Sequence, residues 1–170
     1  MTRIPEIKSK QELNADDQSV YDEIFASRGK RSHPFTYLLH RPELARRVAH
    51  LGAYVLFDSA LSDAERELAI CTTAQEHGCP QEWVGHSKRA RAAGASEAAL
   101  KAIETKGDLD GIDPAEALIV RYARELARDS RLSDATFDAA KARYGNGGML
   151  ELSTLIGYYT MLAFIFGTAV

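Results

Sequence analysis

Segments with helix-forming character cover almost the whole chain, because residues that begin or end helices separate one apolar stretch from the next at short intervals. No segment shows the signals that are typical of strands. The chain is therefore predicted to be all-α, with about seven or eight helices. The expected helices cover residues 16–27, 42–60, 63–77, 80–93, 96–105, 113–129, 133–144 and 149–170.

Two helices in the middle of the chain have clear boundaries. Ser62 and Glu65 form a capping box, in which each side chain binds the backbone N–H group of the other residue at a helix start. That helix is expected to stop before Gly78, because glycine readily adopts the left-handed conformation that ends helices. Pro80 then starts the next helix and leaves Cys79 at its N-cap. A connection this short favours antiparallel packing of the two helices.

The last helix is the most apolar part of the chain. Between Leu150 and Val170 the only charged residue is Glu151, and this length could just cross a bilayer. Serine, threonine and glycine residues interrupt the stretch and no basic flank follows it, which argues against a membrane span. We expect instead a helix that is buried in the core or between subunits, and hence a homo-oligomer.

Length and composition indicate one soluble domain over residues 1–170. The chain is 45% hydrophobic and 26% charged, and a chain of this length buries roughly 70% of its unfolded surface. Its 21 basic and 24 acidic residues give a net charge of -3, which argues against a nucleic-acid-binding protein because such proteins need a basic excess. With only two cysteines and no apolar leader at the N-terminus, the protein is predicted to be cytoplasmic.

Four reactive side chains lie around the turn between the two central helices. Glu82 and His86 are four residues apart, so a helix places them on one face with Cβ atoms about 5–6 Å apart. Cys79 precedes the same helix, whose N-terminus favours a thiolate, whereas the nearby Glu82 disfavours one. Glu67 joins them only if the two helices pack antiparallel. The same residues could also be a structural Glu–His pair on a solvated helix face and an inert thiol.

Several motifs around this cluster resemble the carboxymuconolactone decarboxylase family, which shares an all-helical fold with the alkyl hydroperoxidase D proteins. They are Glu67-Leu68-Ala69-Ile70, Gly78-Cys79 and Glu82-Trp83-Val84-Gly85-His86. Similarities in order and spacing extend over residues 20–170. The resemblance implies that fold, a homotrimer or homohexamer, and a site formed by His86, Glu67 and Glu82 with Cys79 nearby. It implies neither a metal nor an organic cofactor.

One difference from the alkyl hydroperoxidase D branch bears on the chemistry. Those proteins carry a Cys-x-x-Cys pair, a glutamate twelve residues before the first cysteine and a histidine four residues after the second. Glu67, Cys79 and His86 match these positions, but Glu82 replaces the second cysteine. Cys71 cannot substitute for it, since eight helical residues separate it axially from Cys79 by about 12 Å, and a disulfide needs Cα atoms within about 7 Å. The difference favours the decarboxylase branch.

The residues also fit a reaction that needs no cofactor. A carboxylate leaves as CO₂ when its electrons can delocalise into a nearby carbonyl or unsaturated lactone, so the protein supplies positioning, charge and a proton. His86 is predicted to be the general acid/base, because its ordinary pKa lies near neutrality. Glu67 or Glu82 would orient the imidazole or act as a base. We therefore predict a carbon–carbon lyase, or an enzyme of a related step, acting on a small carboxylated lactone or ring compound.

Two other functions remain open at this point. Cys79 could support thiol-dependent peroxidase activity, with an external thiol resolving the oxidised cysteine because a second site cysteine is absent. The chain could also be a binding or assembly protein without catalysis, since a fold does not fix a function.

Residues 28–50 form a basic segment in which Glu43 is the only acid. The segment could steer a carboxylated substrate toward the site. It could equally be a solvated face or form ion pairs across a subunit boundary. Within it, His33-Pro34-Phe35 is predicted to be a loop that could cover the site.

Overall fold

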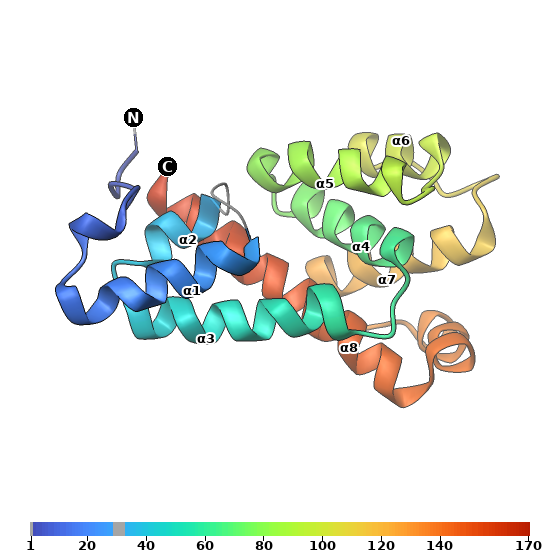
Figure 1. Cartoon of the computed structure of the whole chain (residues 1–170). Coiled ribbons are helices and arrows are strands. Elements are labelled where there is room, and N and C mark those ends of the chain that lie inside the picture. Colours follow the sequence, from blue (N-terminus) through green and yellow to red (C-terminus); the bar gives the residue numbers. More distant parts are fainter. Residues whose placement is uncertain (1, 29–32) are drawn as a thin grey trace. The chain divides into compact units, whose positions relative to one another are not determined.

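The structure is a computed structural model that describes residues 2–28 and 33–170, and all the regular secondary structure in these residues is helical. This confirms the all-α prediction (Figure 1). The α-helices of this part of the chain are α1 (Gln18–Arg28), α2 (His33–Leu38), α3 (Pro42–Ala53), α4 (Asp63–Glu76), α5 (Pro80–Ala92), α6 (Glu97–Thr105), α7 (Pro114–Asp129) and α8 (Asp134–Ala169). Short 3₁₀ helices, η1 (Lys10–Glu12) and η2 (Ala15–Asp17), precede α1, and a π-helical turn, η3 (Tyr54–Asp58), follows α3.

The chain folds into two compact units, and the first comprises residues 1–54 and 164–170. In this unit α3 packs against α1 and α2. The end of α8 belongs to the same unit, where the carbonyl oxygen of Ala169 accepts a hydrogen bond of 2.8 Å from the backbone N–H group of Arg3. Its buried apolar side chains include Val20 and Ile24 of α1, Phe35 of α2 and Ala45 of α3.

The second unit, residues 55–163, has α4 as its central helix. α4 packs against α5, α6 and α7, which surround it in Figure 1. All eight residues from Glu67 to Ala74 are buried, so this helix has no solvent face along that stretch. A carboxylate in such a position needs a partner of opposite charge or a hydrogen-bond donor. Glu67 is therefore the first side chain whose partner must be identified.

The predicted boundaries between α4 and α5 are confirmed. Ser62 Oγ accepts the N–H group of Glu65, and Glu65 Oε2 accepts the N–H group of Ser62 at 3.1 Å, which completes the capping box. Gly78 ends the turn after α4 with a φ of 61°, a conformation that is strained for other residues. Because this turn is short, α5 returns along α4 as expected.

Two local predictions in the N-terminal third were wrong. His33–Leu38 forms helix α2 rather than a loop. Pro34 lies in its first turn, where the missing N–H group costs no hydrogen bond, and Phe35 is buried. The helix expected over residues 42–60 keeps regular α geometry only to Ala53 and continues as the π-helical turn η3.

The predicted turn at residues 145–148 is confined to one position. Gly145 has φ 62° and ψ -176°, and helical geometry resumes directly after it, so the two expected helices form one element with a break. Beside the break, Glu65 Oε1 accepts hydrogen bonds from Arg143 and from the hydroxyl of Tyr144. By length and hydropathy alone α8 could cross a membrane, although half of its most apolar window is buried inside the protein.

Candidate functional site

His86 of α5 lies between two carboxylates. Its Nδ1 is 2.6 Å from Oε2 of Glu67 on α4, and its Nε2 is 3.2 Å from Oε2 of Glu82 on α5. All three side chains are buried, with 6% of His86, 7% of Glu67 and 11% of Glu82 exposed. The structure therefore brings together three of the four predicted site residues.

The local sequence explains how these groups meet. Glu82 and His86 share one face of α5 through their spacing of four residues. Glu67 reaches them because the short turn at Gly78 brings α5 back along α4. Trp83, which follows Glu82 in the motif, is half-buried and is absent from the contacts of the imidazole. The site is thus built on two packed helices rather than on loops.

The two carboxylates favour the protonated form of His86. Nδ1 is hydrogen-bonded to Glu67 and Nε2 lies 3.2 Å from Glu82, so a ring with N–H groups on both nitrogens places its positive charge between two acceptors. Burial by itself lowers the pKa of His86, but the hydrogen bonds to Glu67 and Glu82 and their negative charges outweigh it and raise the pKa above its ordinary value. The buried charge is tolerated because it is paired on both sides.

Tyr159 of α8 completes the packing around the imidazole. Its ring meets the ring of His86 edge to face, with centroids 5.0 Å apart and an interplanar angle of 83°. Burial, followed by the charge of Glu82, raises the pKa of Tyr159 well above its ordinary value, so the phenol stays neutral. No local signal could have predicted this role, because Tyr159 lies in the continuous apolar stretch of the last helix, 73 positions after His86.

Arg89 is a second residue that sequence reasoning missed. It lies three residues after His86 on α5, and its Nη1 is 3.1 Å from both Nδ1 and Nε2 of that ring. When His86 is protonated, this contact sets one cation beside another. Unlike the buried residues of the site, Arg89 is exposed.

Cys79 lies at the N-cap of α5 as predicted, but it is a protected thiol. The residue is 5% exposed, and its Sγ donates a hydrogen bond of 3.7 Å to Oε1 of Gln81. Burial raises its pKa, and this effect outweighs the backbone N–H groups of Gln81 and Glu82, which act in the opposite direction. Cys71 is fully buried in α4, and burial together with the charge of Glu67 raises its pKa to about 12. At neutral pH both cysteines are therefore thiols rather than thiolates.

The carboxylates lie at different nitrogens of the imidazole, so the three side chains do not converge on one point. Throughout residues 2–28 and 33–170, no group of three or more His, Cys, Asp and Glu side chains is placed to hold a metal ion. What this arrangement can do chemically is hold a proton and exchange it between neighbouring groups.

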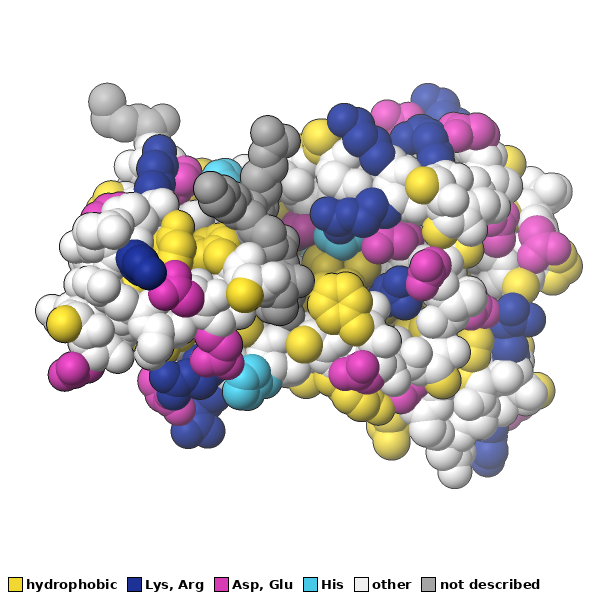
Figure 2. All heavy atoms as spheres, in the orientation of Figure 1, with side chains coloured by type: hydrophobic (Ala, Val, Ile, Leu, Met, Phe, Trp, Pro, Cys, Tyr) yellow, Lys and Arg dark blue, Asp and Glu magenta, His cyan; other side chains and the backbone are white. Residues whose placement is uncertain are grey.

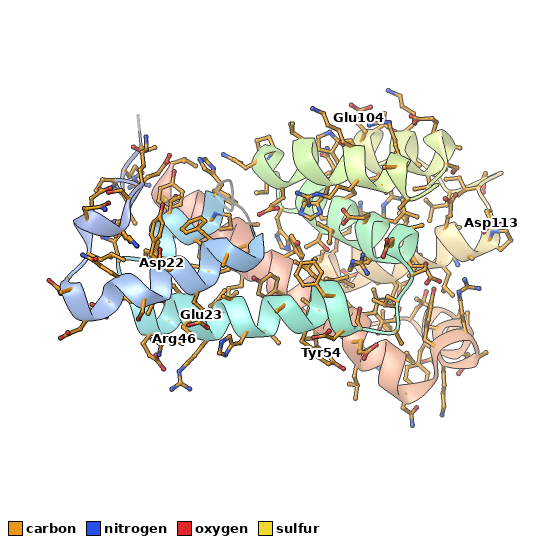
Figure 3. The ribbon with its side chains drawn as sticks, in the orientation of Figure 1. Asp22, Glu23, Arg46, Tyr54, Glu104 and Asp113 are labelled. Carbon is orange, nitrogen blue, oxygen red and sulfur yellow. The ribbon has the colours of Figure 1, made fainter. Side chains whose placement is uncertain are left out.

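The basic segment forms ion pairs within the first unit. Arg46 lies 3.5 Å from a carboxylate oxygen of Glu23 and 2.7 Å from one of Glu43, and His50 lies 2.8 Å from Glu23. Figure 3 shows Glu23 on α1 close to Arg46 on α3. These ion pairs lie within one chain, so the predicted pairs across a subunit boundary and the predicted steering of a substrate both stay predictions. The side chains of residues 28–32 lie outside the described part, so their predicted role stays a prediction.

Over the second unit, basic and acidic side chains are interspersed on the face shown in Figure 2. Helices α5 and α6 contribute ion pairs to this surface, among them Arg91 with Glu97 and Lys101 with Glu104.

Comparison with known proteins agrees with the fold. The model of the carboxymuconolactone decarboxylase family matches residues 42–125, which include all four predicted site residues. Among curated proteins, none matches this sequence.

One similar solved structure is the crystal structure of an alkylhydroperoxidase AhpD core, an uncharacterized peroxidase-related protein from Ralstonia eutropha JMP134. It is 18% identical to this chain with a TM-score of 0.77, and the match covers 99% of this chain and 90% of that chain. Similarity at this level of identity establishes the all-α, AhpD-like core fold.

Proposed function

The chain belongs to the carboxymuconolactone decarboxylase family, and we propose that it is a cofactor-independent acid/base enzyme acting on a small carboxylated lactone or related ring compound. One observation carries the proposal: both ring nitrogens of His86 face a buried carboxylate. A buried imidazolium held in this way is a proton donor with a fixed orientation, which is what general acid catalysis requires.

The two carboxylates have different roles in this proposal. Glu67 makes the shorter contact, 2.6 Å to Nδ1, and is the more buried of the two, so it orients the ring and stabilises its charge. Glu82 makes the longer contact, 3.2 Å to Nε2, and is slightly more exposed. The proton on Nε2 is therefore the one that moves, either directly to the substrate or through Glu82.

The reaction balances without an oxidant or a reductant. The bond between a ring carbon and its carboxylate group breaks, and the electron pair moves into the conjugated carbonyl of the lactone as CO₂ leaves. The proton from Nε2 of His86 then neutralises the carbanion-like product, and a proton from solvent restores the imidazolium. Burial excludes bulk water from the proton donor and strengthens its electrostatic interactions.

Peroxidase chemistry is the weaker alternative. The raised pKa of Cys79 leaves little thiolate to attack a peroxide, and Glu82 stands where the second cysteine would be. The AhpD-core protein is peroxidase-related by its description, but the similarity to it extends to the fold alone. The other alternative, a binding protein without catalysis, would bind the ligand without consuming it.

The test is a turnover assay on a panel of unsaturated lactones that carry a carboxylate, with CO₂ release as the readout. We expect His86→Gln to lower kcat by about 10²–10⁴-fold while the circular dichroism spectrum is retained, and Cys79→Ser to leave kcat unchanged. Equal turnover by His86→Gln would refute the proposal. A compound that raises the melting temperature of the wild type without being consumed would indicate a binding protein instead.

A further inference from the structure

Arg89 differs from the arginines around it in what it contacts. Arg91, Arg128 and Arg143 form ion pairs with glutamates at 2.7 or 2.8 Å. In the described ranges 2–28 and 33–170, Arg89 forms no ion pair, and its only polar contact is the ring of His86. Its side chain is nonetheless held against the site rather than extended into solvent.

The position of Arg89 places it on the solvent side of the proton donor. His86 and its carboxylates are nearly fully buried, whereas Arg89 is exposed. A guanidinium group has five N–H donors in a planar fork, and the contact with the imidazole engages one end of it. The donors on Nε and Nη2 have no polar partner in residues 2–28 and 33–170.

The guanidinium of Arg89 is the cation of the site that no carboxylate of the described residues pairs with. Glu67 and Glu82 are directed to the ring nitrogens of His86 and form no ion pair with the guanidinium. The two carboxylates therefore stabilise the imidazolium directly and leave the guanidinium able to pair with an anion of the ligand. A carboxylate matches the planar fork of arginine and can accept two parallel hydrogen bonds from it.

Gly85 lies beside the guanidinium on α5. A Cβ atom at this position would lie 3.7 Å from Nη2 of Arg89, which is ordinary van der Waals contact. A side chain longer than that of alanine would therefore press against this end of the arginine.

From these contacts we propose that Arg89 binds a carboxylate group of the substrate and makes the site select anionic ring compounds over neutral ones. The inference rests on the proposed function, since it concerns the substrate of the same site. Arg89 acts on binding, and the proton is still supplied by His86. The carboxylate it holds is placed within reach of the imidazolium because the guanidinium itself touches that ring.

Two probes and three variants test this role. The probes are a five-membered unsaturated lactone bearing a carboxylate and the methyl ester of the same compound, and their binding is measured by calorimetry. Arg89→Gln removes the charge, and Arg89→Lys keeps it without the planar fork. Lys88→Gln is the matched control, because Lys88 is the preceding residue on α5, is exposed, and carries the same charge. Melting temperatures verify that each variant is folded.

We expect Arg89→Gln to weaken binding of the carboxylate by about 10- to 100-fold, in line with hydrogen bonds to charged groups, and to leave ester binding unchanged. Arg89→Lys should weaken binding of the carboxylate less than Arg89→Gln does, and Lys88→Gln should change the affinity for neither probe. If the substrate is turned over, KM rises in Arg89→Gln while kcat stays within about threefold, as for a lost contact that is equally strong in the ground state and the transition state.

The inference is overturned if Arg89→Gln weakens binding of both probes equally or of neither. It is also overturned if the wild type binds the acid and the ester with the same affinity. Its failure is separable from failure of the proposed function. Arg89-dependent binding of a carboxylate that is never consumed contradicts the function and supports the inference. Turnover of the substrate with a KM that is unchanged in Arg89→Gln supports the proposed function and contradicts the inference.

Discussion

Replacing Glu67 with glutamine isolates the contribution of one buried charge to the site. The substitution keeps the shape of the side chain and one acceptor oxygen, but removes the negative charge that lies 2.6 Å from Nδ1 of His86. The imidazolium then retains only Glu82 as a charged partner. Because 7% of the Glu67 side chain is exposed, water cannot replace the lost interaction.

The expected loss of stability follows from this geometry. Hydrogen bonds to charged groups contribute about 1.5–3 kcal/mol, and removing one partner of a buried ion pair outright costs about 3–5 kcal/mol. The remaining amide oxygen places Glu67→Gln in the lower range. For a chain of 170 residues, a loss of about 1.5–3 kcal/mol lowers the melting temperature by roughly 3–12 °C.

The loss should also depend on pH. The folded pKa of His86 is raised above the ordinary value, so its protonation contributes stability that is complete below about pH 6.5 and disappears as the pH rises through the folded pKa. Above that pH, Glu67 faces a neutral ring and contributes less. The difference in unfolding free energy between wild type and Glu67→Gln is therefore larger at pH 6 than at pH 9.

Urea unfolding followed by circular dichroism at the two pH values measures this difference. Glu65→Gln is the control, because Glu65 is on the same helix, is largely buried with 16% of its side chain exposed, and pairs with Arg143, whose charge does not titrate in this range. Its loss should be similar at pH 6 and pH 9. A pH-independent loss in Glu67→Gln, or a gain in stability at pH 6, would refute the reasoning.

Four further changes have defined outcomes. Glu82→Gln should lower kcat by about 10²-fold or more with little change in KM, and steady-state kinetics with equal kcat would contradict its role. The thiol of Cys79 should react slowly with iodoacetamide at pH 7, because burial raises its pKa, whereas rapid alkylation would favour thiol chemistry. His86→Gln should flatten the pH dependence of the unfolding free energy above pH 6.5, and an unchanged profile would assign that dependence elsewhere. Gly78→Ala should cost about 1 kcal/mol in urea unfolding, since its φ is 61°, and a neutral effect would contradict the strain.

Local signals in the sequence were sufficient for the elements that frame the site. The capping box of Ser62 and Glu65 and the left-handed conformation of Gly78 depend only on residues close in sequence, so these helix boundaries could be predicted. The same holds for Asp113, whose side chain accepts hydrogen bonds from the first turn of α7. Once these boundaries are known, the spacing of Glu82 and His86 places them on one helix face.

Contacts between distant segments decided the rest. Helix α2 forms where a proline suggested a loop, because burial of Phe35 stabilises it. Tyr159 reaches the imidazole from α8, and nothing in its local sequence distinguishes it from the other apolar positions of that helix. Spacing alone does not determine side-chain directions. It therefore could not predict which carboxylate contacts which ring nitrogen, or that Arg89 folds back onto the ring.

Nitrogen NMR of the His86 side chain at pH 6.5 tests most directly whether this residue stores a proton between Glu67 and Glu82. An unperturbed histidine is about half protonated at this pH. Because the pKa of His86 is raised, we predict that more than half of the rings are protonated at this pH, with N–H signals from both Nδ1 and Nε2 and with the pKa lowered in Glu67→Gln. A neutral ring with one unprotonated nitrogen at pH 6.5 would contradict the proton-donor role on which the proposed function rests.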